Sequence, residues 1–530
     1  MGLVARHDLS GRIVLVDTAR LHGELFLDLA MFKSTHRASC SRQLYLPHCF
    51  AYAQFAISHT SSHGSYHHSV RWISTCDTRQ TTIHDASGPK SFLAAYLPIE
   101  DIEPFERYAP GGYYPVRIDE QFASSRYRIV HKLGYGASST TWLALDKHST
   151  NFVAMKFAVA ELRRPFGNAI LKILRGTNGR FHDADAGITI IPELLDEFQV
   201  EGPDIHGIRR KHHCLVTTLA RMSISEARDA SYNRLFQPLV ARAIAAQLIQ
   251  AIAFMHSRGV VHADLHEANI LLRLPNSIDN LTPDQLYQKY GQPELEEITR
   301  LDGKPLDPWV PTHGVVAVWL GGASDTISLA DSHVFLTDFS ESFRPAVDVH
   351  QVSHTPFALR SPEMLLEPKS HVTFAAEIWS LACAVFAIIG QRPLFDTWFP
   401  TRDKILDEHV DTLGCLPREW WESWVNRHEC FDDQLERVDG APRRLLEHRL
   451  EYSVQEPRKE AGMAEMKEQE KQEFLALLRS MLSFVPEDRP SAQQVVESSW
   501  MQKWAIPALE LTKDIQVLDN TSAAMSRTQQ

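Results

Sequence analysis

The spacing of the apolar residues changes along this chain, and that change constrains the fold most. Residues 126–158 alternate apolar and polar positions and are rich in β-branched side chains, which predicts three β-strands. The stretches 190–202 and 212–220 predict two more strands. From about residue 235 the period becomes helical, because Ile244 and Leu248 recur on the same face as Ile252. A strand-rich part followed by a helix-rich part predicts an α+β fold in two lobes.

One apolar run and two polar stretches lie within the helix-rich part. The run IWSLACAVFAIIG (378–390) is too short to span a bilayer and predicts a buried helix. The polar stretches are residues 274–314 and 447–474. The second carries Glu and Lys at helical spacing, which predicts a solvated helix.

Residues 1–105 differ in composition from the rest. Between Met31 and Lys90 the only acids are Asp77 and Asp85, among many Ser, Thr and His. No period is sustained, so we expect a largely disordered leader. A mitochondrial transit peptide is the alternative, but acids within the first thirty residues argue against it. We therefore expect a cytoplasmic or nuclear protein, with the mitochondrion as the alternative.

Charge and cysteine content exclude some classes of function. The net charge is −12, which argues against a surface that coats nucleic acid and is compatible with a basic partner. The seven cysteines form no Cys-x-x-Cys pair. This pattern is typical of free thiols in a reducing compartment, and it does not indicate a disulfide framework or a zinc site.

Two glycines flank a turn between the first two predicted strands. In LGYGASSTTW, Gly134 and Gly136 allow close approach of backbone N–H groups to phosphate oxygens. Ser139 stands at the third position of this G-x-G-x-x-G pattern. Lys156 ends the apolar strand FVAMK, from which a lysine can reach nucleotide phosphates. Each feature alone is common, since hairpins use glycine and lysines at strand ends reach solvent.

The stretch HADLHEAN (262–269) is a polar loop between two apolar segments. Asp264 can accept a proton from a substrate hydroxyl, and Asn269 can bind Mg²⁺ through its amide oxygen. His262 would hold the loop. Asp338 follows an apolar strand in HVFLTDFSESF, which suits a second Mg²⁺ ligand. A capped polar turn would explain one of these residues, but not the ordered set.

Two further residues predict a buried ion pair. Glu363 lies in ALRSPEMLLE and Arg489 lies in PEDRPSAQQVVESSWM. A bidentate Arg–Glu pair would fix the helix-rich lobe if its hydrogen bonds are complete.

Taken in order, these residues resemble the eukaryotic protein kinases, and more narrowly the SR-protein kinases and their fungal relatives. The resemblance covers residues 127–504 and rests on YYPVRIDEQFASSRYRIVHKLGYGASSTTWLALD, ELLDEF, RLDGKPL and ALRSPEMLLE. It implies a bilobal kinase domain over 106–504, with a β-rich N-lobe at 127–220 and an α-helical C-lobe at 221–504. Insertions would occupy 274–330 and 430–470, and 505–530 would be a tail.

The resemblance also implies a site and a reaction. ATP would bind between the lobes and give its γ-phosphate to serine or threonine, with Asp264 as catalytic base. Lys156, Asn269 and His266 would complete the catalytic set, and Asn269 and Asp338 would hold Mg²⁺. The nucleotide would contact Leu133, Gly134, Gly136, Ser139, Thr141, Ala154, Lys156, Thr218 and Leu219, with Thr217 as gatekeeper. The partner would be a protein substrate with Arg/Ser-rich segments, and the enzyme would be a monomer that binds neither nucleic acid nor membrane.

The loop departs from the kinase pattern at two positions. Ala263 replaces the Arg that commonly receives an activation-loop phosphate, as SR-protein kinases also do. We therefore expect activity without phosphorylation between Asp338 and Glu363. His266 replaces a Lys that contacts the transferred phosphate, and an imidazole could still donate to a phosphate oxygen.

Three other departures concern the support of the site. The candidate helix FGNAILKILRG (166–176) contains no acid to pair with Lys156, and Glu161 lies too early. Glu377 stands where Asp is usual, and Ser340 stands where Gly is usual. These changes motivate an alternative, a pseudokinase that binds nucleotide without efficient transfer. A small-molecule phosphotransferase is a further alternative, because such enzymes often carry a similar Asp-Leu-His loop.

Overall fold

The chain divides into two units, Met1–His68 and Ser69–Gln530. The computed structural model describes residues 3–7, 13–17, 95–160, 167–175, 187–204, 207, 209–274, 278, 281–349, 354–367, 369–397 and 399–513. In the first unit, β1 (Leu3–His7) pairs antiparallel with β2 (Ile13–Asp17). Most of the predicted leader lies outside the described residues.

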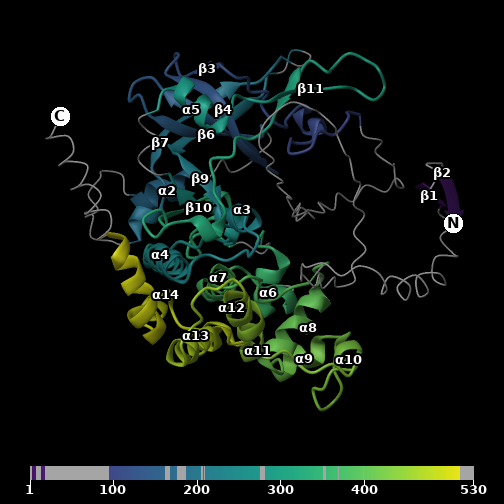
Figure 1. The fold of residues 1–530 in the computed structure, drawn as a ribbon, viewed down its shortest axis with the longest axis vertical. Coiled ribbons are helices and arrows are strands. Elements are labelled where there is room, and N and C mark those ends of the chain that lie inside the picture. Colours follow the sequence, from purple (N-terminus) through teal and green to yellow (C-terminus); the bar gives the residue numbers. More distant parts are fainter. Residues whose placement is uncertain are drawn as a thin grey trace, which may run out of the picture. The chain divides into compact units, whose positions relative to one another are not determined.

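A six-stranded antiparallel sheet forms the first part of the second unit (Figure 1). Its strand order is β3-β4-β5-β6-β8-β7. The strands are β3 (Gln121–Phe122), β4 (Tyr127–Gly136), β5 (Ser139–Asp146), β6 (Phe152–Ala158), β7 (Leu194–Glu201) and β8 (Lys211–Thr218). All five strands expected from the sequence are present. In β6, Val153, Met155 and Phe157 are buried while Ala154 and Lys156 are partly exposed, which explains the apolar spacing that predicted this strand.

The rest of the second unit is mainly helical, which confirms the predicted α+β arrangement (Figure 1). Its helices are α2 (Asn168–Arg175), α3 (Ile224–Asp229), α4 (Pro238–Ser257), α5 (Pro283–Tyr290), α6 (Pro362–Leu366), α7 (Phe374–Ile389), α8 (Arg402–Leu413), α9 (Arg418–Ser423), α10 (Arg427–Cys430), α11 (Leu446–Leu450), α12 (Glu456–Glu460), α13 (Glu468–Met481) and α14 (Ala492–Val496). Small antiparallel ladders join β13 (Val334–Leu336), β10 (Ile270–Arg273) and β9 (Ala220–Ser223), and separately β11 (Leu295–Glu297) and β12 (His313–Val315).

Short 3-10 and π segments connect these elements. They are η3 (Phe105–Tyr108), η4 (Ile188–Ile190), η5 (Glu267–Asn269), η6 (Ser324–Thr326), η7 (Phe339–Glu341), η8 (Phe357–Leu359), η9 (Glu451–Gln455), η10 (Pro486–Asp488) and η11 (Met501–Ala505).

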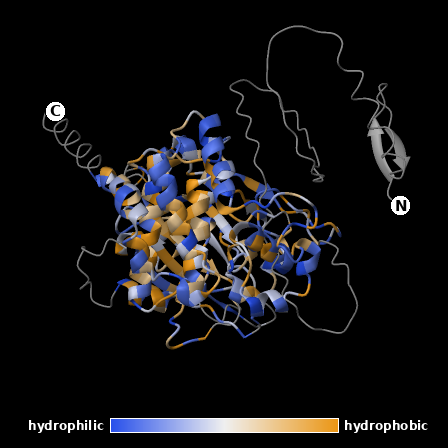
Figure 2. Ribbon diagram, turned by 90° about the horizontal axis from the view of Figure 1, so that it is seen from below, coloured by the Kyte–Doolittle hydropathy of each residue, from blue (hydrophilic) through white to orange (hydrophobic). Residues whose placement is uncertain are grey.

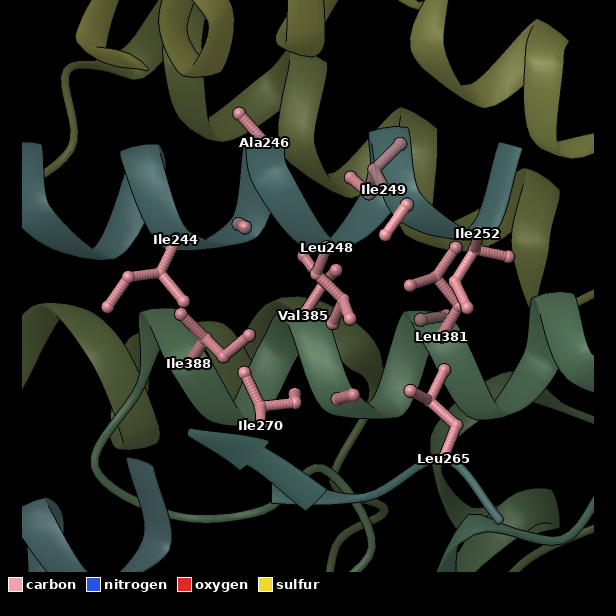
Figure 3. Close-up of a cluster of buried hydrophobic side chains, with 14 of the residues drawn as sticks. Ile244, Ala246, Leu248, Ile249, Ile252, Leu265, Ile270, Leu381, Val385 and Ile388 are labelled. Atoms are coloured by element: carbon pink, nitrogen blue, oxygen red, sulfur yellow. The ribbon is translucent and has the colours of Figure 1, made fainter. Parts of the chain in front are cut away.

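Two apolar helices, α4 and α7, form the centre of the helical part. Figure 2 shows apolar residues concentrated on helices inside this part, with polar residues outside. α4 is long and apolar enough to cross a membrane, but most of its side chains are buried inside the domain. In Figure 3, Leu248 of α4 packs beside Val385 of α7, while Leu265 and Ile270 approach α7 from the adjacent loop and strand. The polar stretch 262–269 is therefore anchored in the apolar core by Leu265 within it and by Ile270 immediately after it.

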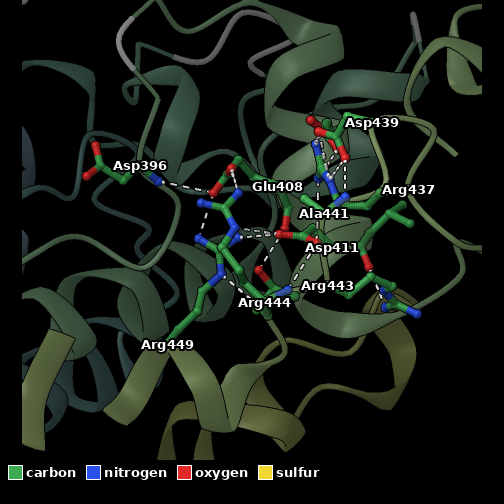
Figure 4. Close-up of polar contacts among 12 residues, drawn as sticks. Asp396, Glu408, Asp411, Arg437, Asp439, Ala441, Arg443, Arg444 and Arg449 are labelled. Carbon is green, nitrogen blue, oxygen red and sulfur yellow. Dashed lines mark hydrogen bonds and ion pairs between the residues drawn. The ribbon is translucent and has the colours of Figure 1, made fainter. Parts of the chain in front are cut away.

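The expectation of a solvated helix over 447–474 is wrong. This stretch contains α11, η9, α12 and the start of α13. Its Arg449 is buried and donates to Glu408 Oε2 (2.6 Å) and Asp411 Oδ2 (3.1 Å) of α8, as Figure 4 shows. Glu470 is also buried and pairs with Arg242 of α4. Helical charge spacing did not distinguish exposed ion pairs from buried ones.

Segments outside the expected lobes pack onto the sheet. Tyr96, Ile102 and Phe105, which the sequence assigned to the leader, form an apolar cluster with Ile298 and Val310 from the predicted insertion. In the insertion, Tyr287 of α5 donates to the backbone oxygen of Val130 in β4 (3.0 Å). At the other end of the chain, helical backbone continues over 506–513, and Ala508 and Leu509 join the main core.

Candidate functional site

The loop 262–269 is held from below by one buried carboxylate. Glu377 of α7 accepts hydrogen bonds at Oε1 from the backbone N–H groups of His262 (2.7 Å) and Ala263 (2.9 Å). Its Oε2 lies 2.8 Å from His256 Nε2 of α4. Burial raises the pKa of Glu377, but His256 and these donors outweigh burial, so its pKa lies below the ordinary value. The longer Glu therefore holds the loop in the place where Asp was expected.

The His262 ring links this loop to the segment that carries Asp338. Its Nδ1 accepts from the backbone N–H of Asp264 (3.4 Å), so Nε2 carries the proton and donates to the backbone oxygen of Thr337 (2.9 Å). The ring also packs edge-on against Phe339. The two chain segments with the expected metal ligands are thereby fixed to one another.

Asp264, Asn269 and His266 lie together at the head of the loop. Asn269 Nδ2 donates to the Asp264 backbone oxygen (2.9 Å), and it lies 3.0 Å from His266 Nε2. His266 Nε2 is 3.6 Å from Asp264 Oδ1. Burial raises the pKa of Asp264, but the imidazoles of His266 and His262 lower it below its ordinary value. A carboxylate in this setting is ionised at neutral pH and can accept a proton.

Asp338 lies opposite this loop and contacts Lys156. Its backbone adopts the left-handed conformation (φ 61°) at the start of η7. Asp338 Oδ1 is 3.0 Å from Lys156 Nζ, and it accepts a hydrogen bond from Ser340 Oγ (2.8 Å). Burial raises the pKa of Asp338, but the charge and hydrogen bond of Lys156, together with the Ser340 hydrogen bond, outweigh burial and hold it well below its ordinary value. Ser340 thus orients the carboxylate from the position where glycine was expected.

The two expected metal ligands lie on paired segments, because the backbone N–H of Thr337, next to Asp338, donates to the Asn269 backbone oxygen (2.8 Å). Besides burial, the charge of Asp338 raises the pKa of Asp264. The Asn269 amide nitrogen donates to the Asp264 backbone oxygen, so the amide oxygen of Asn269 points away from Asp264. Carboxylate and amide oxygens are the donors that Mg²⁺ prefers. The residues present therefore fit a magnesium ion.

The glycine turn and the lysine lie in one row across the sheet. Thr141 of β5 pairs with Gly134 of β4 on one side and with Lys156 of β6 on the other. No atom lies within 4 Å of the position that a side chain would take at Gly134 or Gly136. The turn therefore leaves open space beside its backbone.

The residues expected near adenine also come together. Leu133 and Ala154 pack against the buried cluster that contains Leu219. Ala154 of β6 pairs with Thr217 of β8, immediately before Thr218 and Leu219. The structure therefore brings together an apolar surface, a glycine turn and a lysine. Ser139 is buried between Gly136 and Ala158 in the adjoining ladder.

The helix expected next to Lys156 is α2, and it carries no acid. Gly167, immediately before α2, nevertheless lies against the Asp338 segment, because a Cβ at Gly167 would lie 1.9 Å from the backbone oxygen of Phe339. Glu161 lies outside the described residues. Among the side chains described here, Asp338 supplies a carboxylate to Lys156.

The segment from Asp338 to Glu363 is bound to the loop without phosphate. Phe343 pairs with Val261, and Thr355 Oγ1 donates to the Ala263 backbone oxygen (3.0 Å). Arg360 Nε in turn donates to the Thr355 backbone oxygen (2.7 Å). These contacts surround Ala263, the position at which protein kinases commonly carry an arginine that binds a phosphate on this segment.

The predicted pair Glu363–Arg489 is confirmed. Arg489 Nη1 and Nη2 each lie 2.7 Å from a Glu363 oxygen, and both side chains are buried. The guanidinium also donates to the backbone oxygens of Ser483, Ala375 and Phe484. The charge is therefore both paired and fully hydrogen-bonded.

Sequence reasoning missed several residues that support the site. His256 lies in FMHSRGVV, and from the sequence it is indistinguishable from any other polar residue at the end of a helix. Its spacing from Glu377 gives no signal, since the contact joins two helices. Tyr113 and Arg107 contact the glycine turn from a segment that precedes the strands. Tyr113 begins the stretch that carries the family resemblance, but no local pattern indicates that Tyr113 or Arg107 contacts the turn.

Comparison with known proteins identifies the family. Residues 127–279 and 327–501 match the protein kinase domain, and the gap between the matches falls within the predicted insertion. The chain is 24% identical over 434 residues to a serine/threonine protein kinase of Aspergillus fumigatus, covering 78% of this chain and 95% of that protein. It is 26% identical over 422 residues to the serine/threonine-protein kinase SRPK of Physarum polycephalum, covering 75% and 90%.

A shorter match is to the mouse SRSF protein kinase 3, which is 31% identical over 185 residues, covering 33% of this chain and 30% of that protein. The family match spans more than half of the chain and includes both lobes. The chain therefore belongs to the protein kinase family and is a serine/threonine protein kinase.

Proposed function

We propose that this kinase transfers the γ-phosphate of Mg·ATP to serine hydroxyls in Arg/Ser-rich proteins. Asp264 accepts the proton of the attacking hydroxyl, while Lys156 orients the nucleotide phosphates. Asn269 and Asp338 hold Mg²⁺, which neutralises phosphate charge when bound. Leu133, Ala154 and Leu219 contact adenine. His266 donates to a phosphate oxygen after its ring turns from Asn269.

One observation carries the catalytic part of the proposal. Asp264 Oδ1 is buried and accepts no hydrogen bond within 3.5 Å from any described residue, although His266 Nε2 lies 3.6 Å away. A buried ionised oxygen without a donor is costly. A substrate hydroxyl at this position would supply the missing donor and would lie where the carboxylate can take its proton.

The choice of substrate rests on two further observations. Two of the similar proteins are named SRPK and SRSF protein kinase. The chain also carries a net charge of −12, which attracts arginine-rich segments over distances near the Debye length.

A peptide transfer assay tests the proposal. The substrates are a peptide of alternating Arg and Ser and a matched peptide in which Ala replaces every Arg. We expect transfer to the first peptide, with Asp264→Asn about 10²–10⁴-fold slower than the wild type. Equal rates for the wild type and Asp264→Asn would contradict the catalytic role and favour a nucleotide-binding pseudokinase. Equal rates on both peptides would remove only the arginine preference.

A further inference from the structure

The turn between β4 and β5 is held from outside by an earlier segment of the chain. Tyr113 Oη donates to the backbone oxygen of Gly136 (2.7 Å), and the Arg107 guanidinium donates to the backbone oxygen of Ala137. Both donors precede residue 127, where the kinase family match begins. We call residues 103–113 the N-terminal brace.

These two contacts orient the amides of the turn. In a trans peptide the C=O and N–H bonds point in opposite directions. The Gly136 oxygen shares its peptide unit with the Ala137 N–H, and the Ala137 oxygen shares its unit with the Ser138 N–H. The two N–H groups therefore point away from the brace. Neither donates a hydrogen bond to any described residue.

The brace is closely packed where its two donors arise. The backbone N–H of Tyr113 donates to the Arg107 oxygen (2.8 Å), which closes a tight loop. A Cβ at Gly112 would lie 1.8 Å from that same oxygen, so only glycine fits there. The Tyr113 ring is buried and packs edge-on against Tyr108.

A second attachment joins the brace to β4 before the glycines. Lys132 and Glu103 form an ion pair in which both side chains are buried, and Tyr108 also donates to Glu103. A buried pair of this kind resists sliding, since separating it would leave two charges without partners. The brace therefore contacts β4 on both sides of Gly134, at Lys132 and at Gly136.

We propose that Tyr113 and Arg107 are positioning residues for nucleotide binding, because they hold the Ala137 and Ser138 N–H groups toward the ATP phosphates. This inference rests on the proposed function, since it assigns these two amides to ATP. The brace affects the triphosphate and leaves adenosine binding unchanged. Arrays of backbone N–H groups of this kind bind phosphate in many proteins.

Paired binding measurements on the full chain test the inference. Tyr113→Phe removes one hydroxyl, and Arg107→Met removes an exposed guanidinium. We expect each variant to weaken Mg·ATP binding by calorimetry about 3–10-fold, equivalent to one hydrogen bond. The KM for ATP rises by the same factor, kcat changes less than about 2-fold, and adenosine affinity is unchanged.

Tyr114→Phe is the matched control. Its hydroxyl donates to Glu120 (2.8 Å) in the neighbouring loop, so its loss should leave both affinities unaltered. Unchanged ATP affinity in Tyr113→Phe and Arg107→Met would overturn the inference, as would an equal loss for ATP and adenosine. If the wild type bound no ATP, the proposed function would fail with it.

Discussion

The loop 262–269 and the glycine turn 134–139 face the same site but are supported differently. The loop is held by its own lobe, through Glu377 of α7 and the apolar anchors Leu265 and Ile270. The turn is held by Tyr113 and Arg107, which lie outside the family match. In the helical lobe a changed residue is compensated by residues of the same lobe, whereas the turn of the sheet depends on a segment outside the family match.

Breaking the buried Glu363–Arg489 ion pair should have the largest effect on stability. Arg489→Leu leaves the buried Glu363 carboxylate without its partner, so the free energy of unfolding should fall by about 3–5 kcal/mol in urea titrations. Arg418→Leu is the control, because its pair with Glu422 is exposed and its loss should change nothing measurable. Equal stability of the two variants would contradict this view of the helical lobe.

Removing the charge at Glu377 should lower kcat more than the loss of an equally buried carboxylate elsewhere in the lobe. In Glu377→Gln the amides of His262 and Ala263 lose their ionised acceptor, the loop shifts, and kcat should fall about 100-fold. Glu470→Gln is the matched control, because Glu470 is equally buried but pairs with Arg242 away from the loop. It should lose stability without this loss in kcat. A normal kcat in Glu377→Gln would show that the loop needs no such support.

Acid should destabilise the helical lobe through a buried neutral histidine. Burial lowers the pKa of His409 from 6.5 to about 3, and neither ring nitrogen has a partner among the described residues. Between these values the unfolded chain binds a proton that the folded protein does not. His409 therefore costs the folded state about 2 kcal/mol at pH 5 and nothing above pH 7.

The measurement is the free energy of unfolding at pH 7.5 and pH 5 for the wild type and His409→Phe. The variant should lose less stability on acidification, since Phe packs between Trp379 and Phe395 without titrating. The exposed His428→Gln serves as the control. An identical pH dependence in wild type and His409→Phe would rule out this role.

Phosphatase treatment should have the smallest effect. Thr355 and Arg360 bind the Asp338–Glu363 segment to Ala263 without phosphate. Enzyme treated with a broad-specificity phosphatase should therefore keep its rate within about 2-fold. Loss of activity that ATP pre-incubation restores would show instead that a phosphate on this segment is required.

The sequence predicted the elements whose period is strong and the residues whose order is unusual. Strands over 126–158 and the α4 and α7 helices follow from apolar spacing. The prediction of a solvated helix over 447–474 is wrong, because a buried arginine such as Arg449 and an exposed arginine give the same spacing along a helix. Contacts such as Tyr113 with Gly136 and His256 with Glu377 join residues far apart in the chain, and only the fold brings them together.

The central claim is that Asn269 and Asp338 hold one divalent ion that binds with ATP, next to the Asp264 carboxylate that accepts the substrate proton. Thermal unfolding with and without Mg·ATP tests it most directly, with ATP plus EDTA as the reference. The wild type should gain about 2–5 °C in Tm from Mg·ATP, and Asp338→Ala should lose this gain. A wild type whose Tm does not respond, or an Asp338→Ala variant with the full response, would contradict the claim.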